Sequence, residues 1–210
     1  MYHLDEERSI GMFWDKVASF YDGTETLING KVFNSTGRVV ATEIEPDDLV
    51  LECACGTGAI SREIAPYCRK LIATDMSGGM RKQARKKCRE FDNVKIGCAD
   101  IMNLRFKDET FDKVVAGNVI HLLDDPQYAV KELVRVCKKG GKVIIPTYLN
   151  DKNETLRTSA KFLAMIGVEF KSTFNIDSYK QFFSDAGYNS VSYHVVEGRM
   201  PCAVAVITKQ

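Results

Sequence analysis

The stretch Val50–Ser61, which reads VLECACGTGAIS, decides the fold of this chain. An apolar run ends in an acidic residue, Glu52, then passes through residues with almost no side chain and becomes helical. Gly56 and Gly58 let the backbone bend sharply and approach a ligand closely, and the following helix offers unpaired N–H groups at its N-terminus. The segment therefore predicts a cradle for a nucleotide or nucleoside at a strand-to-helix turn.

From residue 49 onward, strand and helix patterns alternate, as they do in a parallel sheet covered on both faces. Strands are expected at 49–53, 70–74, 94–98, 111–116, 142–146, 190–196 and 203–208, and helices after Gly58 and at 77–88, 125–137 and 177–186. The connection between the last two strands, about 197–202, is too short for a parallel crossover, so these strands should pair antiparallel. We predict an α/β fold, a doubly wound sheet of seven strands, mostly parallel with an antiparallel C-terminal hairpin strand, with helices on both faces.

Composition limits the choice of partners. The chain has 210 residues, of which 45% are hydrophobic, and this suits a single domain over 1–210. Its 29 basic and 28 acidic residues give a net charge of +1, which supplies no general field for nucleic acid or an anionic membrane. No apolar run approaches the length of a membrane span, and the N-terminus lacks the basic-then-apolar order of a secretory signal. A small-molecule partner and a cytoplasmic location are expected.

The cysteines predict neither disulfides nor a metal site. They number seven, an odd count, and no C-x-x-C pair occurs among them. Cys53 and Cys55 stand close together, but no second pair accompanies them and the three histidines are dispersed. We expect the cysteines to be reduced, small, buried hydrophobic residues.

Two segments resemble known enzymes. The glycine-rich stretch resembles the first motif of the class I S-adenosylmethionine (SAM)-dependent methyltransferases, in which an acidic residue is followed by glycine at every second position. Glu52 is the acid, and Ala54, Gly56 and Gly58 stand at the glycine positions, with Ala54 departing from the pattern. The segment 14–22, WDKVASFYD, resembles the N-terminal cover of small-molecule methyltransferases of the ubiquinone/menaquinone-biosynthesis type. The resemblance implies a Rossmann-like sheet, SAM as cofactor and S-adenosylhomocysteine as product.

The resemblance also implies roles for particular residues toward SAM. Asp75 follows the second strand at a distance where nucleotide-binding folds place an acid for the ribose hydroxyls. Asp100 matches the residue that takes the adenine amino group, and Met76 and Ile101 would enclose the ring. Glu52 would orient the methionine portion, near the turn of Gly56 and Gly58. Two further residues are expected beside the cofactor, Asn118 near the sulfonium and Tyr21 in the N-terminal cover.

Acceptor contacts are expected from several parts of the chain. Residues 1–45 would form a helical cover, beginning with an amphipathic helix at about 6–20 that carries Trp14. Residues 149–175 form a candidate lid, and Tyr148 precedes them. His121 lies a few residues after the fourth strand and could remove a proton from an acceptor hydroxyl or thiol, or could only shape the pocket.

Other functions remain open at this stage. Gly56, Gly58 and Ser61 nearly spell the G-x-G-x-x-G pattern of NAD-dependent oxidoreductases, although a C-terminal antiparallel hairpin favours a methyltransferase. A non-catalytic, SAM-binding regulatory protein would carry the same cradle. The six basic residues within 81–89 fit the solvated face of a helix better than a nucleic-acid site. We expect direct in-line methyl transfer to a small molecule, with no nucleic acid, metal or stable membrane association.

Overall fold

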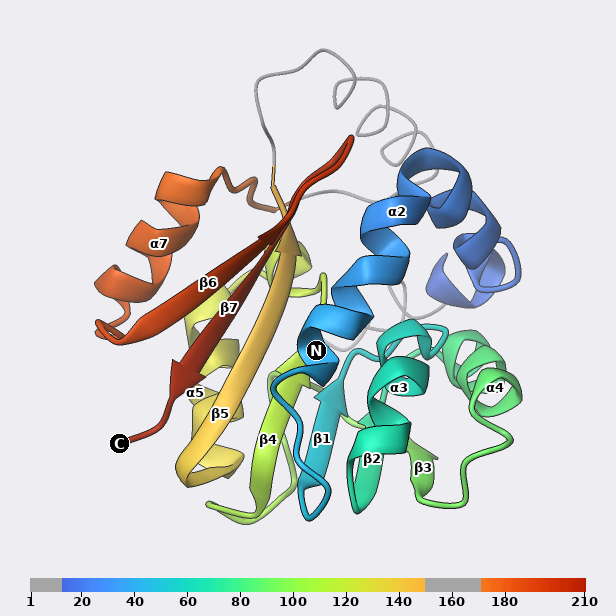
Figure 1. Cartoon of the computed structure of the whole chain (residues 1–210), viewed down its shortest axis with the longest axis horizontal. Coiled ribbons are helices and arrows are strands. Elements are labelled where there is room, and N and C mark those ends of the chain that lie inside the picture. Colours follow the sequence, from blue (N-terminus) through green and yellow to red (C-terminus); the bar gives the residue numbers. More distant parts are fainter. Residues whose placement is uncertain (1–12, 150–170) are drawn as a thin grey trace, which may run out of the picture.

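A computed structural model describes residues 13–149 and 171–210, without the side chains of residues 24–28. In this part of the chain, seven strands form one sheet in the order β3-β2-β1-β4-β5-β7-β6 (Figure 1). The strands are β1 (Leu49–Cys53), β2 (Lys70–Thr74), β3 (Val94–Gly97), β4 (Phe111–Ala116), β5 (Cys137–Tyr148), β6 (Val191–Val196) and β7 (Cys202–Thr208). β7 pairs antiparallel with β5 and β6, whereas the other neighbouring strands pair parallel. The predicted sheet and its antiparallel C-terminal hairpin are confirmed.

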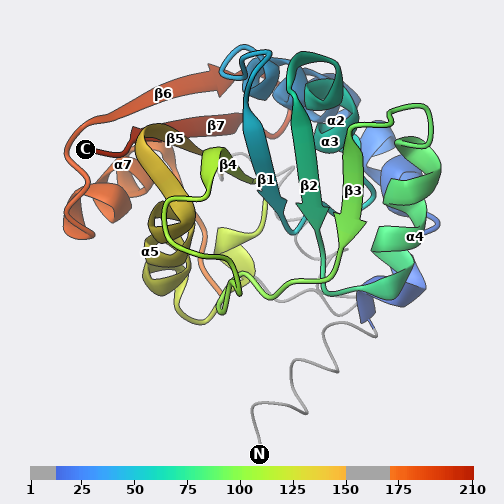
Figure 2. The same cartoon turned by 90° about the horizontal axis from the view of Figure 1, so that it is seen from below.

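Helices cover both faces of the sheet. They are α2 (Tyr21–Ala41), α3 (Ala59–Ile64), α4 (Gly78–Lys87), α5 (Pro126–Val136) and α7 (Ile176–Asp185), with short 3-10 turns η1 (Ala65–Tyr67) and η2 (Ile120–Leu122). One core joins α5 and α7 to the sheet through Leu133 and Phe183, and a second core joins α2, α3 and α4 to the other face through Val40, Ile64 and Ala84. Figure 2 shows α5 and α7 on the side opposite α2 and α3. None of the helices in the described ranges is both long and apolar enough to cross a bilayer.

The starts of α4 and α5 follow local capping signals. The Ser77 hydroxyl accepts the Met80 N–H at 3.0 Å at the start of α4. The Asp125 carboxylate accepts the Tyr128 N–H at 2.9 Å at the start of α5, where Pro126 takes the first helical position. These contacts satisfy backbone donors that a helix N-terminus leaves unpaired.

The N-terminal cover differs in detail from the prediction. Residues 13–17 are helical, and a turn over 18–20 separates them from α2, so the helix expected at 6–20 ends earlier, and its part before residue 13 lies outside the described residues. α2 is kinked at Asn29, whose backbone leaves the helical region. The Asn29 side chain donates to the Met200 carbonyl at 2.7 Å, which fastens the kink to the β6–β7 connection.

β5 is longer than the expected strand 142–146. It begins at Cys137, directly after α5, because Cys137 pairs with Phe111 before the register shifts and Lys142 pairs with Lys113. Gly140 has a φ of +74° in this irregular stretch. The two glycines, Gly140 and Gly141, therefore mark an irregularity within β5 and not a turn before it. Glycine tolerates the positive φ at this site without strain. Of the candidate lid at 149–175, residues 150–170 lie outside the described residues.

Candidate cofactor and acceptor site

The glycine-rich turn joins β1 to α3 through left-handed backbone conformations. The φ angles are +51° at Ala54, +54° at Gly56 and +82° at Gly58. A Cβ atom added at Gly58 would lie 3.1 Å from the Ala84 Cα atom, so a larger residue would press against α4. A Cβ atom added at Gly56 would meet no atom within 4 Å. The turn thus holds α3 and α4 together at Gly58 and leaves open space beside Gly56.

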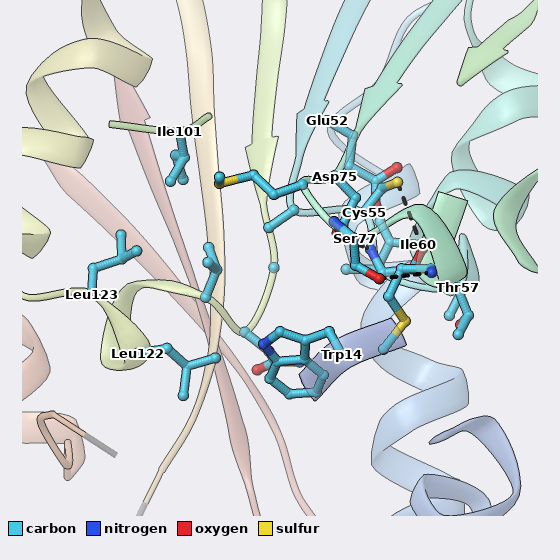
Figure 3. Close-up of a pocket in the computed structure, with 18 of the residues that line it drawn as sticks. Trp14, Glu52, Cys55, Thr57, Ile60, Asp75, Ser77, Ile101, Leu122 and Leu123 are labelled. Carbon is cyan, nitrogen blue, oxygen red and sulfur yellow. Dashed lines mark hydrogen bonds between the residues drawn. The ribbon is translucent and has the colours of Figure 1, made fainter. Parts of the chain in front are cut away.

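That open space belongs to a cavity of about 370 Å³ at the carboxyl ends of the parallel strands. This is within the size range of small-molecule sites. Figure 3 shows Glu52 and Asp75 on one side of the cavity and Leu122 and Leu123 on the other, with Trp14 between them in this view. Its lining includes the predicted residues Trp14, Tyr21, Glu52, Ala54, Gly56, Asp75, Met76, Asp100, Ile101, Asn118 and Tyr148. The structure therefore brings these sequence-predicted residues around a single space, whereas Gly58 and His121 do not line it.

Glu52 is buried at the end of β1 and accepts a hydrogen bond from the Ser61 hydroxyl of α3. Burial raises the pKa of its carboxyl to about 8, although the Ser61 bond and the charge of Lys87 act in the opposite direction. Removal of a charged carboxylate from water favours its neutral form. Glu52 consequently ties the strand end to α3 and holds a proton near neutral pH.

Asp75 follows β2, and its carboxylate accepts hydrogen bonds from the backbone of the glycine-rich turn and of the segment before α4. Its Oδ2 atom accepts the Gly56 N–H at 2.9 Å, and its Oδ1 atom accepts the Ser77 N–H at 2.8 Å. Burial raises its pKa, and the two N–H donors oppose that shift. A carboxylate has about four acceptor sites. Asp75 can therefore accept two further hydrogen bonds from vicinal hydroxyls while it keeps both backbone bonds.

The segment after β3 forms the next part of the wall. The Asp100 Oδ1 atom accepts the Met102 N–H at 2.8 Å, which curls residues 100–103 into a tight turn. Ile101 is 7% exposed, and Met76, after β2, is 45% exposed. Asp100, Ile101 and Met76 all line the cavity, and a carboxylate together with apolar side chains suits a flat heterocycle with an amino group.

Asn118 shapes the end of β4. It has a φ of +53°, its N–H donates to the Pro146 carbonyl at 2.8 Å, and its side-chain oxygen accepts the Tyr148 N–H at 3.1 Å. Asparagine is one of the residues that tolerate this left-handed conformation. The contacts join the ends of β4 and β5, so that Asn118 and Tyr148 line the cavity together.

His121 lies in η2 and is not among the residues that line the cavity. It is 6% exposed, and burial lowers the pKa of its imidazole to about 4. Its carbonyl accepts the N–H groups of Lys171 and Ser172 at 3.0 and 3.2 Å. The neighbouring Leu122 and Leu123 line the cavity in its place. The geometry of the described residues thus favours a packing role for His121, and a role as base has no support in it.

Several lining residues were not anticipated from the sequence. They are Phe33, Thr36, Cys55, Thr57, Ala59, Ile60, Ser77, Met80, Ala99, Met102, Gly117, Val119, Leu122, Leu123, Asp124 and Asp125, whereas Lys171 also lines the cavity and was expected only as part of the candidate lid 149–175. Thr57 lies between the two glycines of the turn, a position from which it could have been inferred. Phe33 and Thr36 come from α2 and carry no local signal, because only the packing of α2 on the sheet brings them there.

Most of the thiols are buried, and Cys55 is the one that lines the cavity. Among the seven cysteines, Cys98 alone is exposed. Burial raises the pKa of Cys88, Cys68 and Cys137 to about 11, and raises those of Cys53 and Cys55 as well. A thiol held neutral is a weak nucleophile and a weak metal ligand. The expectation that the cysteines are buried hydrophobic residues agrees with the structure for six of them and is wrong for Cys98, which is exposed.

An open α/β sheet with a nucleoside-sized cavity at its carboxyl edge, and with β7 inserted antiparallel between β5 and β6, has the architecture of the class I methyltransferases. Residues 51–145 match the family model described as a methyltransferase domain. A demethylmenaquinone methyltransferase of Clavibacter sepedonicus is 32% identical over 140 residues, which are 65% of this chain and 56% of the relative. A phosphatidylethanolamine N-methyltransferase of Cereibacter sphaeroides is 34% identical over 64% of this chain and 68% of its own length.

A solved structure shows the same fold. It is a SAM-dependent methyltransferase of Thermotoga maritima, described as a possible histamine N-methyltransferase, with a TM-score of 0.71 and 20% identity over 95% of this chain and 99% of its own. The chain belongs to the class I SAM-dependent methyltransferase family. The predicted resemblance to the quinone-biosynthesis group is confirmed, and SAM is the cofactor that this family implies.

Proposed function

We propose that this chain transfers the methyl group of SAM to a small, mainly apolar acceptor. The observation that carries the proposal is the arrangement of the cavity in Figure 3, with Glu52, Asp75 and the glycine turn on one side and Leu122 and Leu123 on the other. The chain spans 56% of the length of the Clavibacter relative. The activity and the substrate of that whole enzyme therefore come to this chain only as a proposal.

The residues of the polar side fit SAM by their chemistry. When bound, SAM supplies a methyl group activated by a positively charged sulfur. Asp75 keeps two acceptor sites for the ribose hydroxyls, and Asp100 with Ile101 offers an acceptor and an apolar surface to the adenine. The open space at Gly56 leaves room for the methionine portion, close to Glu52.

The other side of the cavity provides the acceptor pocket. Leu122 and Leu123 supply apolar surface there, and Phe33, Tyr148 and Trp14 add aromatic surface elsewhere in the lining. Transfer from an activated methyl group requires alignment of the acceptor and exclusion of water more than it requires a base. The pocket can therefore support in-line transfer with His121 outside it.

A quinol-like aromatic ring is the acceptor that we propose. Demethylmenaquinone methyltransferases are similar to this chain over most of its length, including one of Renibacterium salmoninarum that is 25% identical over 90% of it. A flat ring suits a pocket with leucine and aromatic walls. An aminophospholipid is the competing acceptor, since the Cereibacter relative is named for one. The expected cytoplasmic location and the absence of nucleic-acid binding stay predictions.

Radiolabelled SAM tests the proposal. The protein is incubated with labelled SAM and either a reduced demethylated naphthoquinone or phosphatidylethanolamine in detergent, and organic-phase radioactivity is measured. We expect transfer to the quinol, and much less transfer with Asp75→Asn at a SAM concentration that does not saturate the variant. Binding of SAM without transfer to any of a panel of acceptors would support a regulatory protein, and binding of NAD in place of SAM would support an oxidoreductase.

A further inference from the structure

The N-terminal segment repeats one dipeptide type, an aromatic residue followed by aspartate. The pairs are Trp14 with Asp15 and Tyr21 with Asp22. The rings of Trp14 and Tyr21 both line the cavity and meet edge to face, with their centroids 5.9 Å apart. Neither aspartate lines the cavity. Each aspartate instead contacts an element that carries the cofactor site.

Asp15 binds the start of α4. Its Oδ1 atom accepts the Ser77 hydroxyl at 2.6 Å and the Gly79 N–H at 2.7 Å. Those two donors hold the pKa of Asp15 below its usual range. Ser77 lines the cavity, and its N–H donates to Asp75. Asp15 and Asp75 therefore both accept hydrogen bonds from Ser77.

Gly79 is shaped for this contact. A Cβ atom added there would lie 2.9 Å from both the Cα atom and the carbonyl oxygen of Asp15, closer than packed atoms approach. At the adjacent Gly78, the nearest atoms would be at 3.8 Å or more, an ordinary contact. The backbone of the N-terminal segment thus lies directly against one glycine of α4 and not against the other.

Asp22 binds the glycine turn and the far end of α4. Its Oδ1 atom accepts the Thr57 hydroxyl, and its Oδ2 atom pairs with the Lys87 ammonium. Lys87 also donates to the Thr57 oxygen at 3.1 Å, which closes a triangle of three elements. Thr57 is 2% exposed and lies between the two glycines of the cradle. Charge-assisted hydrogen bonds of this kind are stronger than neutral ones.

We infer that Asp15 and Asp22 are positioning residues, which clasp the segment carrying Trp14 and Tyr21 onto α4 and the glycine turn and thereby close the cavity over SAM. The inference rests on the proposed function for the identity of the ligand. The clasp itself is a property of the ligand-free chain, because its contacts join protein groups only.

Adding one methyl group tests the clasp. Gly79→Ala removes no hydrogen-bonding group and adds a good helix former, yet it must displace Asp15. Gly78→Ala is the matched control in the same turn of α4. Trp14 is the only tryptophan of the chain, so its fluorescence reports the segment without labelling. We expect Gly79→Ala to shift Trp14 emission to the red without ligand and to weaken S-adenosylhomocysteine binding by about tenfold, and Gly78→Ala to do neither.

Side-chain variants separate positioning from folding. Asp15→Ala and Asp22→Ala should act as Gly79→Ala does, whereas Asp15→Asn keeps an acceptor oxygen and should restore most of the binding. Asp108→Ala, which removes an exposed carboxylate paired with Arg135, is the control for loss of an ion pair. Melting curves check that each variant folds.

Two results would overturn the inference. One is unchanged Trp14 emission and S-adenosylhomocysteine binding in Gly79→Ala and both alanine variants. The other is weaker binding with unchanged emission, since the aspartates would then act without moving the aromatic segment. If the wild-type chain binds no S-adenosylhomocysteine, the proposed function fails, and the emission of the ligand-free variants alone decides whether the clasp exists.

Discussion

Replacing Gly56 with valine should weaken cofactor binding strongly and leave the fold intact. Gly56 has a φ of +54° and lines the cavity, and a Cβ atom there would meet no protein atom within 4 Å. We infer that the added side chain would occupy space the ligand needs. Its folding cost is the strain of a left-handed L-residue, about 1 to 2 kcal/mol. Overfilling an occupied site costs about 1 to 3 kcal/mol more, or about 5- to 150-fold in Kd.

Gly140 provides the matched control. Its φ is +74°, a Cβ atom there also meets no atom within 4 Å, and it does not line the cavity. Gly140→Val should therefore lower the melting temperature by a similar amount, about 2 to 8 °C for a chain of this size, and should leave binding unchanged. Calorimetric titration with S-adenosylhomocysteine compares the two variants. Equal affinity in both would refute the placement of the cofactor beside Gly56.

Three further variants probe single side chains. In Asp75→Asn, the amide oxygen can accept only one of the two backbone N–H groups, so SAM binding should weaken by about 2 to 3 kcal/mol. Calorimetry measures this change, and an unchanged affinity would show that Asp75 does not bind the ribose. The pKa of Glu52 is about 8 in the folded chain and 4.5 in the unfolded chain, so the folded chain binds the proton more tightly. The folded chain should therefore lose stability relative to Glu52→Gln as the pH rises from about 4.5 to about 8. Thermal melts should show the wild-type chain losing stability relative to Glu52→Gln over that interval, and a constant difference between the two melting temperatures would contradict the buried, protonated carboxyl. His121→Ala should destabilise the fold but keep the pH profile of kcat, because the imidazole is buried with a pKa of about 4; loss of a transition near neutral pH would restore His121 as a base.

The sequence predicted those cavity-lining residues whose positions follow from the ends of the strands. Glu52, Asp75 and Asp100 each stand at or just after a strand of a parallel sheet, and the carboxyl ends of such strands meet at one edge. Ala54 was recognised at a glycine position, and its φ of +51° shows that the backbone keeps the glycine-like conformation there.

Residues held by distant contacts could not be predicted in this way. Asp15 reaches Ser77 and Asp22 reaches Lys87 across more than sixty residues of sequence, and neither pairing leaves a local pattern. His121 was placed correctly after β4, but the 3-10 turn that contains it decides which way its side chain points. Hydrophobic periodicity carries no information about that rotation.

Calorimetric titration of the wild-type chain with S-adenosylhomocysteine, and in parallel with NAD, tests the central claim most directly. The proposed function predicts one S-adenosylhomocysteine bound per chain, competition by SAM, and no heat from NAD. Binding of NAD with no binding of either SAM compound would contradict it.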